Sequence, residues 1–308
     1  MSKNLSELSG RKGLDLNLFE QLGVAARETG TPDLEAQEQL SQEFLVGKSN
    51  VYGSVSFYDF LRPENQGKKI YVCNGSSCLT AGTQDEVRAK IARHFNPEEV
   101  GEMCCLGRCH ENRSFHYNGK NYSGQDIDNL VAIREQQSPT VEQYKVTSSG
   151  AAILTTPYGP VNEYYQIFKD CLQQPATDLL AQLRDSGLRG RGGAGFSMAF
   201  KLESCRNQKE ETRFIVCNAD EGDPGAYSDR YIMEQRPHSL LMGMMIAGYI
   251  AGASYGVVYI RGEYPESVQI ITEAIADLES QNLLGQNILG SGFDYHFKVI
   301  KAQGAYIC

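Results

Sequence analysis

Two close pairs of cysteines are the residues of this sequence best suited to chemistry. Cys73 and Cys78 are separated by four residues, and Cys105 and Cys109 are separated by three. Four thiolates that converge on one centre bind a soft metal, either as zinc or as an iron-sulfur cluster. Structural zinc usually prefers pairs separated by two residues, so this spacing favours the cluster. Buried free thiols are the remaining alternative, although such cysteines normally occur singly in a core.

Small residues stand between the paired cysteines. Gly75 and Ser76 lie in the first loop, and Gly107 lies in the second. They allow backbone amides to turn inward and donate hydrogen bonds to the sulfurs of a cluster. The chain has nine cysteines, an odd number, so a complete disulfide framework is not expected. Cys171, Cys205 and Cys217 are isolated in sequence and are expected to be buried thiols.

A glycine-rich stretch, residues 187–196, contains five glycines and two arginines. Its amides and guanidinium groups could approach a phosphorylated ligand closely. The stretch follows a predicted helix rather than a strand, so it is not the usual dinucleotide-binding fingerprint. A flexible turn is the alternative interpretation.

An acidic loop, residues 218–225, follows the next predicted strand. It carries three carboxylates and one amide, from Asn218, Asp220, Glu221 and Asp223. Ligand sites of α/β proteins are commonly built where strands end. The spacing does not match a calcium loop of the EF-hand type. The alternative to a ligand site is an acidic turn exposed to solvent.

The elements that must position these residues form two α/β units. In the first unit, a strand at 70–72 leads to Cys73, a helix is predicted at 83–94, and an Asn-Gly turn predicts a hairpin over 115–122. A helix at 125–135 closes it. In the second unit helices alternate with strands, which predicts a layered α/β domain. The helices are expected at 178–185, 238–253 and 265–278, and the strands at 213–216, 257–260 and 295–300.

We therefore divide the chain into four parts. A polar and helical lead-in covers 1–44, with residues 1–31 partly disordered before a helix at 32–45. The cysteine domain covers 45–137, a linker and covering segment covers 138–174, and the larger α/β domain covers 175–308.

The composition limits the possible partners and location. A length of 308 residues, 41% of them hydrophobic, suffices for about two domains. A net charge of -9 and a pI of about 5.2 argue against nucleic acid as a ligand. Residues 1–17 are polar and show no targeting signal, so we expect a cytoplasmic protein. The longest apolar stretch, 240–253, falls short of the about 20 residues of a membrane span, which predicts a buried helix and no membrane insertion.

The first unit resembles the thioredoxin-like 2Fe-2S ferredoxin family, which includes the 24-kDa-type subunit of respiratory complex I. The resemblance covers roughly residues 45–135 and is carried by Val51-Tyr52-Gly53-Ser54-Val55-Ser56-Phe57-Tyr58 together with both cysteine pairs. It implies a 2Fe-2S cluster held by Cys73, Cys78, Cys105 and Cys109, with Cys104 as a bystander.

The second unit resembles the 51-kDa-type flavoprotein subunit of complex I. The same module occurs in NAD-reducing hydrogenases and in NAD-dependent formate dehydrogenases. The resemblance covers about 175–308 and is carried by the glycine-rich stretch and the acidic loop, together with Arg-Gly-Glu-Tyr at 261–264, Asn-Ile-Leu-Gly-Ser-Gly-Phe at 287–293 and Gly-Ala-Tyr-Ile-Cys at 304–308. It implies a partial Rossmann-like α/β domain that binds FMN and NAD(H).

The resemblance also implies roles for individual residues. Those expected around FMN are Gly190, Arg191, Gly192, Lys201, Asn218, Asp220 and Glu221. Those expected to receive NADH are Gly193, Ala194 and Phe196. The residues expected at the catalytic centre are Glu221, Asp223 and Tyr306.

The implied activity is that of an NADH:acceptor oxidoreductase, or diaphorase. Asp223 and the fusion of the two units favour the module of a bidirectional NAD-reducing hydrogenase, with iron-sulfur and hydrogenase or dehydrogenase subunits as partners. A formate dehydrogenase or an NADH:quinone oxidoreductase is the alternative. Because family members continue beyond the residues matched at Cys308, we expect a C-terminally truncated chain, with a 4Fe-4S cluster only in the missing part. A second hypothesis, from a different class of function, is a non-catalytic 2Fe-2S carrier or assembly module. A third hypothesis is a zinc-binding structural protein.

Overall fold

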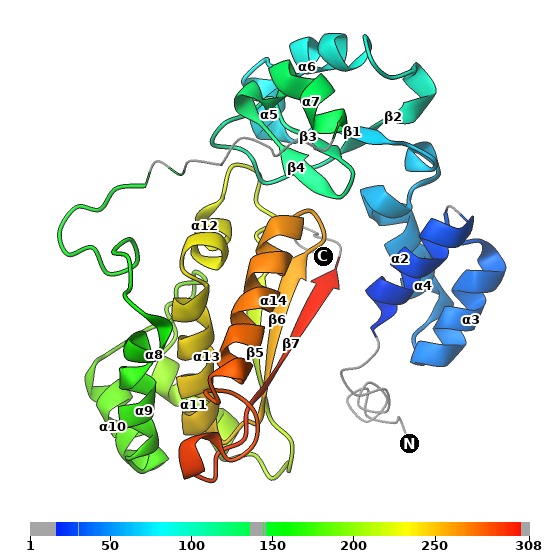
Figure 1. Cartoon of the computed structure of the whole chain (residues 1–308). Coiled ribbons are helices and arrows are strands. Elements are labelled where there is room, and N and C mark those ends of the chain that lie inside the picture. The colour runs from blue at the N-terminus through cyan, green and yellow to red at the C-terminus, as the bar shows by residue number, and fades with distance from the viewer. Residues whose placement is uncertain (1–16, 30, 136–143, 145, 303–308) are drawn as a thin grey trace.

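A computed structural model describes residues 17–29, 31–135, 144 and 146–302 of the chain. Within these residues it contains a four-stranded sheet of order β2-β1-β3-β4 and a three-stranded sheet of order β5-β6-β7, with helices around both (Figure 1). The predicted α/β class, a smaller N-terminal sheet domain followed by a larger α/β domain, is confirmed. The motif at 304–308, with Tyr306, lies outside the described residues.

Within the described residues, three helices precede the first sheet: α2 (Leu18–Thr29), α3 (Leu34–Phe44) and α4 (Lys48–Phe57). Part of the segment 1–31, for which partial disorder was predicted, is therefore helical: Leu22 of α2 is fully buried, and Leu18 and Ala26 pack against the same cluster. Its cluster includes Leu40, Val51 and Val55, so one core joins residues on both sides of the predicted boundary at 44. Two short 3-10 turns, Asp59–Leu61 and Pro63–Asn65, lead to the first strand.

The smaller sheet contains the predicted strand and hairpin, together with the strand β2, which was not predicted. Its strands are β1 (Ile70–Cys73), β2 (Val100–Met103), β3 (Phe115–Tyr117) and β4 (Lys120–Tyr122). β1 and β2 are parallel, and β3 and β4 form the antiparallel hairpin that the Asn-Gly turn predicts. Its helical segments are α5 (Ser76–Thr80), α6 (Gln84–Ile91), a 3-10 turn at Pro97–Glu99 and α7 (Leu130–Arg134). The helix predicted at 125–135 begins as a 3-10 segment, Gly124–Asn129.

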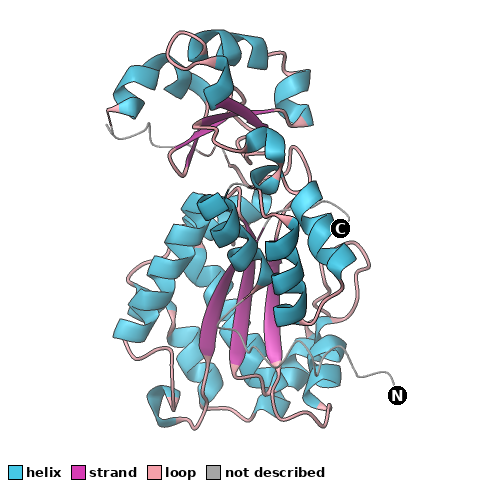
Figure 2. Ribbon diagram, turned by 90° about the vertical axis from the view of Figure 1, so that its right-hand side faces the viewer, coloured by secondary structure: helices cyan, strands magenta, loops and turns pink. Residues whose placement is uncertain are grey.

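The larger domain is built on three parallel strands, β5 (Phe214–Ala219), β6 (Tyr255–Arg261) and β7 (His296–Ala302). Figure 2 shows them side by side with helices along them and the smaller sheet beyond their ends. The flanking helices are α10 (Ala176–Asp185), α11 (Met198–Arg206), α12 (Ser228–Gln235), α13 (Pro237–Ala251) and α14 (Pro265–Ser280), followed by a 3-10 turn at Ile288–Gly290. The carboxyl ends of the strands point toward the smaller sheet (Figure 1), so loops at these ends meet the cysteine domain.

The apolar helix α13 lies in the core of the larger domain, as predicted for residues 238–253. A side chain at Gly248 would come within 2.3 Å of the ring of Tyr295, so glycine is needed for this close packing. Among the described residues, no helix is both long enough and apolar enough to cross a membrane.

The segment predicted as a linker is partly structured. Residues 136–143 and 145 lie outside the described residues, but α8 (Val161–Tyr164) and α9 (Gln166–Leu172) are helical. Tyr165 and Phe168 are fully buried in the core of the larger domain. This half of the segment therefore covers the larger domain.

Candidate functional site

The two cysteine loops begin at neighbouring strand ends. β1 and β2 run parallel, with Cys73 opposite Met103. Cys73 is the last residue of β1, and Cys105 follows β2 after one residue. Parallel strands end at the same edge of a sheet, and α5 carries Cys78 back toward that edge. This topology brings both pairs together as the sequence predicts.

The four thiols form a continuous chain of contacts. The sulfurs of Cys105 and Cys109 lie 3.3 Å apart, and Cys73 hydrogen-bonds to both Cys105 and Cys78. The bond with Cys73 lowers the pKa of Cys78 to about 6. Bonds with Cys109 and then Cys73 lower the pKa of Cys105 to about 2, while the same contacts raise the pKa values of Cys73 and Cys109. Low pKa values favour the thiolate, which is the metal-binding form.

The surroundings of these sulfurs fit a 2Fe-2S cluster. The amide of Gly107 donates to Sγ of Cys105 at 3.5 Å, and the amide of Gly225 donates to Sγ of Cys109 at 3.3 Å. A side chain at Gly75 would lie 3.1 Å from Cβ of Cys105, so the first loop is held close to the second. Within the described ranges no three His, Cys, Asp or Glu residues surround a site for a single metal ion. Two thiol pairs could supply two irons with two thiolates each.

The other cysteines in the part of the chain that the structure describes lie apart from this chain of contacts. Cys104 is exposed, and its backbone amide donates to Oδ2 of Asp59 at 2.7 Å. Cys171, Cys205 and Cys217 are only half-buried and pack at the margins of the apolar clusters of the larger domain, so the expectation of full burial is wrong.

The acidic loop begins where β5 ends. Oδ1 of Asn218 accepts a hydrogen bond from the amide of Asp220 at 3.2 Å. The carbonyl of Asp223 accepts from the amide of Ala226 at 3.0 Å, and the Asp223 side chain is exposed. The loop therefore folds back on itself and presents a carboxylate to solvent.

Glu221 is turned into the protein and supports α12. Its backbone adopts a φ of 38°, and its carboxylate accepts the amides of Asp229 at 2.8 Å and Arg230 at 3.0 Å, in the first turn of that helix. The hydroxyl of Tyr264 also donates to it, at 3.3 Å. A carboxylate at a helix N-terminus is stabilised by unpaired amides and by the helix dipole, so Glu221 ties the middle of the acidic loop to α12.

The glycine loop forms a small hairpin between α10 and α11. The amide of Gly190 donates to the carbonyl of Phe196 at 2.8 Å, and Arg189 donates to the carbonyl of Gly195 at 2.9 Å. Phe196 is 48% exposed and contacts Phe200 edge to face at 5.3 Å. The predicted ligand residues of this region that lie at the surface are Arg191, Gly192, Gly193, Ala194 and Lys201.

A cleft of about 270 Å³ opens where residues 57–62, the second cysteine loop and the acidic loop meet. Its walls include Tyr58, Arg62 and Cys105 from the cysteine domain, and Pro224 and Glu263 from the larger domain. The acidic loop and the cysteine site thus line one common cleft.

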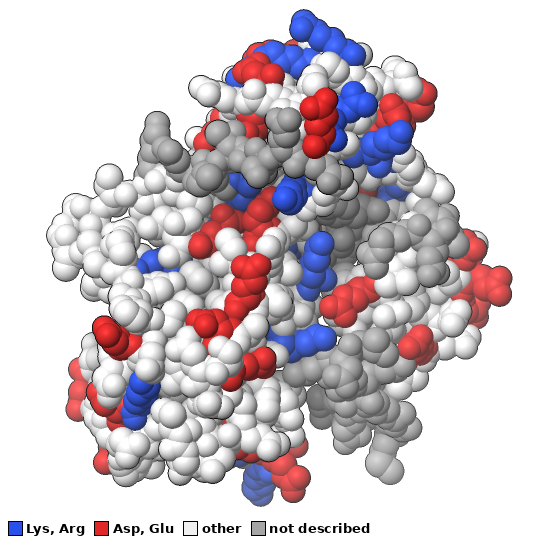
Figure 3. Space-filling view, in the orientation of Figure 1, with Lys and Arg blue, Asp and Glu red and all other residues white. Residues whose placement is uncertain are grey.

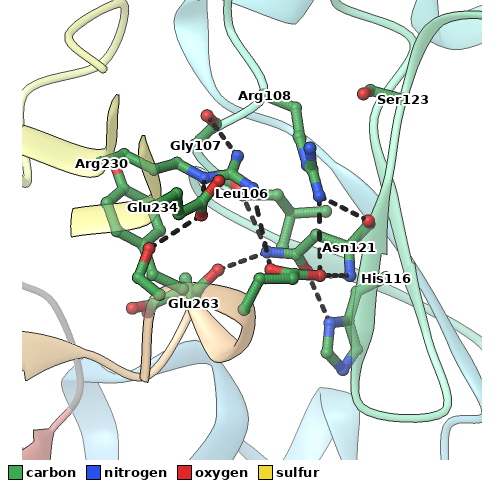
Figure 4. A network of polar contacts seen from close by, with 12 residues as sticks. Leu106, Gly107, Arg108, His116, Asn121, Ser123, Arg230, Glu234 and Glu263 are labelled. Atoms are coloured by element: carbon green, nitrogen blue, oxygen red, sulfur yellow. Dashed lines mark hydrogen bonds and ion pairs between the residues drawn. The ribbon is translucent and has the colours of Figure 1, made fainter. Parts of the chain in front are cut away.

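A buried polar network joins the two sheet domains (Figure 4). Asn121 on β4 donates through Nδ2 to the carbonyl of Leu106 at 3.2 Å and to the carbonyl of Glu263. The amide of Asn121 donates to Oε1 of Glu266 on α14 at 2.9 Å. One buried side chain therefore holds the second cysteine loop against the larger domain.

Two arginines of the larger domain bind the same cysteine loop. Arg230 is fully buried, pairs with Glu234 at 2.8 Å and donates to the carbonyl of Gly107 at 2.8 Å (Figure 4). Arg261, at the end of β6, donates to the carbonyl of Cys105 at 2.9 Å. Buried guanidinium groups are retained where they are paired and hydrogen-bonded, so both arginines hold the loop between the domains.

Sequence reasoning missed this network. No local sequence pattern indicates a role in this network for Arg108, Asn121, Arg230, Glu234 or Glu266. Arg261 was noted only as part of the Arg-Gly-Glu-Tyr motif at 261–264. Arg230 and Gly107 are 123 positions apart, and no local pattern predicts such a partner. The sequence predicts that Gly107 brings an amide toward sulfur, which it does, but a side chain there would also lie 2.1 Å from the ring of Tyr264.

Acidic and basic side chains are interspersed on the face of the molecule seen in Figure 3. The described residues on this face do not gather into a broad basic field. This distribution agrees with the net charge of -9.

Two family models match the chain. The model of the thioredoxin-like 2Fe-2S ferredoxin matches residues 12–137, and the model of the Nuo51 FMN-binding domain matches residues 183–308. The cofactors expected from the resemblance, a 2Fe-2S cluster and FMN, are those of the two matched families.

The curated relatives are subunits of larger oxidoreductases. An NADH-quinone oxidoreductase subunit of Aquifex aeolicus is 42% identical over 144 residues, which cover 47% of this chain and 34% of the relative. NAD-reducing hydrogenase HoxS subunit alpha of Cupriavidus necator is 29% identical over 300 residues, 88% of this chain and 50% of the relative. NADP-reducing hydrogenase subunit HndC of Solidesulfovibrio fructosivorans is 42% identical over 144 residues, 47% of this chain and 29% of the relative. The chain thus spans half or less of the length of these three relatives.

A solved structure shares the arrangement of both domains. The crystal structure of an NAD+-reducing NiFe-hydrogenase in the H2-reduced state superimposes with a TM-score of 0.69 at 25% identity, covering 94% of this chain and 52% of that one. Residues 12–137 thus match the thioredoxin-like 2Fe-2S ferredoxin family, and residues 183–308 match the Nuo51 FMN-binding domain.

Proposed function

We propose that the chain is the electron-input module of an NADH-linked redox complex. In this proposal the larger domain binds FMN and NAD(H), and the smaller domain carries a 2Fe-2S cluster. The observation that carries the proposal is the direct contact between the acidic loop and the cysteine site, where the amide of Gly225 lies 3.3 Å from Sγ of Cys109. A flavin held by that loop would lie next to an acceptor of its electrons.

Bound FMN would supply the conversion of a hydride pair into single electrons. The residues proposed to hold it come from both loops. Arg191 and Lys201 are exposed cations that suit its phosphate, and Asn218 and Asp220 offer polar groups at the strand end. Phe196 is exposed enough to stack on the adenine of NADH. Asp223, at the loop tip, is proposed to face the nicotinamide side of the site.

The comparisons support an NAD-reducing hydrogenase as the parent complex. The relative from Cupriavidus necator aligns across 88% of the chain, which includes both domains, whereas the Aquifex aeolicus relative aligns over 47%. Asp223, which in the sequence favours the hydrogenase module, supports the same parent complex. We therefore propose a cytoplasmic diaphorase module whose partners are iron-sulfur and hydrogenase subunits, with the NADH:quinone oxidoreductase module as the alternative.

The activity is tested by steady-state oxidation of NADH with ferricyanide or viologen as acceptor, with FMN supplied. The proposal expects turnover that depends on added FMN and is absent when FMN is left out. Quenching of flavin fluorescence on the same sample measures FMN binding separately. Flavin binding without NADH oxidation would contradict the proposed nicotinamide site.

The second candidate is a non-catalytic carrier that uses only its cluster. The contrast between a buried cysteine site and an exposed glycine loop favours this possibility. A reconstituted protein whose cluster is reduced by dithionite, but which neither binds FMN nor oxidises NADH, would establish it.

A further inference from the structure

The acidic loop touches the metal site of the neighbouring domain through its backbone. Gly225 adopts a φ of 99°, which side chains rarely tolerate, and this conformation points its amide at Sγ of Cys109, 3.3 Å away. A Cβ at this position would lie 3.2 Å from Oγ of Ser77 in the first cysteine loop. Gly225 therefore sits between both cysteine loops.

The acidic loop is anchored at Glu221 by contacts within the protein. Arg261 donates to the carbonyl of Glu221 at 3.0 Å and to the carbonyl of Cys105 at 2.9 Å. The Glu221 carboxylate in turn binds the first amides of α12. One buried guanidinium thus ties the acidic loop to the cysteine loop, which fixes where the Gly225 amide points.

We propose that the Gly225 amide and the positioning residue Arg261 set the reduction potential of the 2Fe-2S centre from the flavin domain. A hydrogen bond to a ligand sulfur stabilises the more negative, reduced state of an iron-sulfur centre. The step concerned is the addition of one electron to the oxidised centre, with no bond made or broken. This inference rests on the cluster of the proposed function but does not need its NADH oxidation.

The first test compares Gly225→Ala with Gly222→Ala after anaerobic reconstitution with iron and sulfide, without FMN. Gly225→Ala must shift the loop because of its positive φ and the contact with Ser77, whereas Gly222 is not among the residues with positive φ. An electron spin resonance titration with dithionite gives the midpoint potential. We expect the reduction equilibrium constant of Gly225→Ala to fall by up to about tenfold, or about 59 mV for one electron, and that of Gly222→Ala to be unchanged. Equal potentials in the two variants would overturn the proposal.

The second test uses the unmutated protein, so it stands even if Gly225→Ala does not fold. Pro224-Gly225 is the only Pro-Gly pair in the sequence, so carbonyl-13C proline with 15N glycine labels this amide uniquely. We expect its 15N resonance to carry a shift that appears with the cluster and changes when dithionite reduces it. A resonance that is the same with and without the cluster would contradict the hydrogen bond. Failure to assemble any 2Fe-2S centre would instead refute the proposed function.

Discussion

The cysteine site and the glycine loop differ in how much of the protein holds them in place. The cysteine loops are bound by Asn121, Arg230 and Arg261, whose partners lie in the other domain. The glycine loop makes hydrogen bonds between its own residues, and Phe196 at its end is 48% exposed. The comparison indicates that contacts from both domains preorganise the cysteine site, while the glycine loop, where we propose that the nucleotide binds, is held mainly by its own hydrogen bonds.

The largest effect is expected where that preorganised site loses a ligand. Cys105→Ser should abolish the reconstituted 2Fe-2S centre, because Cys105 contacts two other thiols and receives the Gly107 amide. Iron and acid-labile sulfide analysis with electron spin resonance provides the measurement. The adjacent Cys104→Ser is the matched control, since Cys104 is exposed, and should keep its full iron content. Loss of the centre in both variants would show that the ligand set is assigned incorrectly.

The next largest effect is expected from the buried domain contact. Arg230→Met leaves the carboxylate of Glu234 buried without its closest cation and should lower the free energy of unfolding by about 3–5 kcal/mol. Urea unfolding measures it. Arg184→Met removes a surface pair with Glu203 and should change the free energy by about 1 kcal/mol or less. Equal costs would mean that the interface contributes no more to stability than the surface does.

A glycine pair separates the cost of backbone strain from the cost of lost domain packing. Gly107 and Gly119 have similar positive φ values, 70° and 78°, but only Gly107 faces the ring of Tyr264. Gly119→Ala should lower the free energy of unfolding by about 1–2 kcal/mol through backbone strain alone. Gly107→Ala should lower it by about 1–3 kcal/mol more, because the added methyl group overpacks the contact with Tyr264. Thermal or urea unfolding of both variants gives the difference. A smaller cost at Gly107 than at Gly119 would contradict the docked arrangement of the domains.

The smallest effect on stability is expected in the glycine loop. Phe196→Ala should leave the free energy of unfolding within about 0.5 kcal/mol, because the side chain is half exposed. It should raise the KM for NADH by about tenfold, since loss of an aromatic stack costs roughly 1 kcal/mol or more. Phe200→Ala, at a neighbouring ring that is 55% exposed, is the control. An unchanged KM in Phe196→Ala would remove Phe196 from the nucleotide site.

Much of the fold could be predicted because its signals are local. The Asn118-Gly119 turn predicts the hairpin, and the alternation of apolar segments predicts the strands of the larger domain. The helix α2 was missed because residues 1–31 were treated as one polar segment, although Leu18, Leu22 and Ala26 recur at helical spacing and share one apolar cluster. The cysteine pairs were visible from their spacing and strand ends. The network around Asn121 and Arg230 could not be predicted, since a buried polar side chain is explained only by partners that the fold brings from more than 100 positions away.

The measurement that tests the central claim most directly is the spectrum of the reconstituted protein before and after NADH. The chain is loaded anaerobically with iron, sulfide and FMN, and absorbance and electron spin resonance spectra are recorded. Our account predicts a bleached flavin band together with the signal of a reduced 2Fe-2S centre. A centre that responds to dithionite but not to NADH would contradict the proposed path from the nucleotide site to the cysteines.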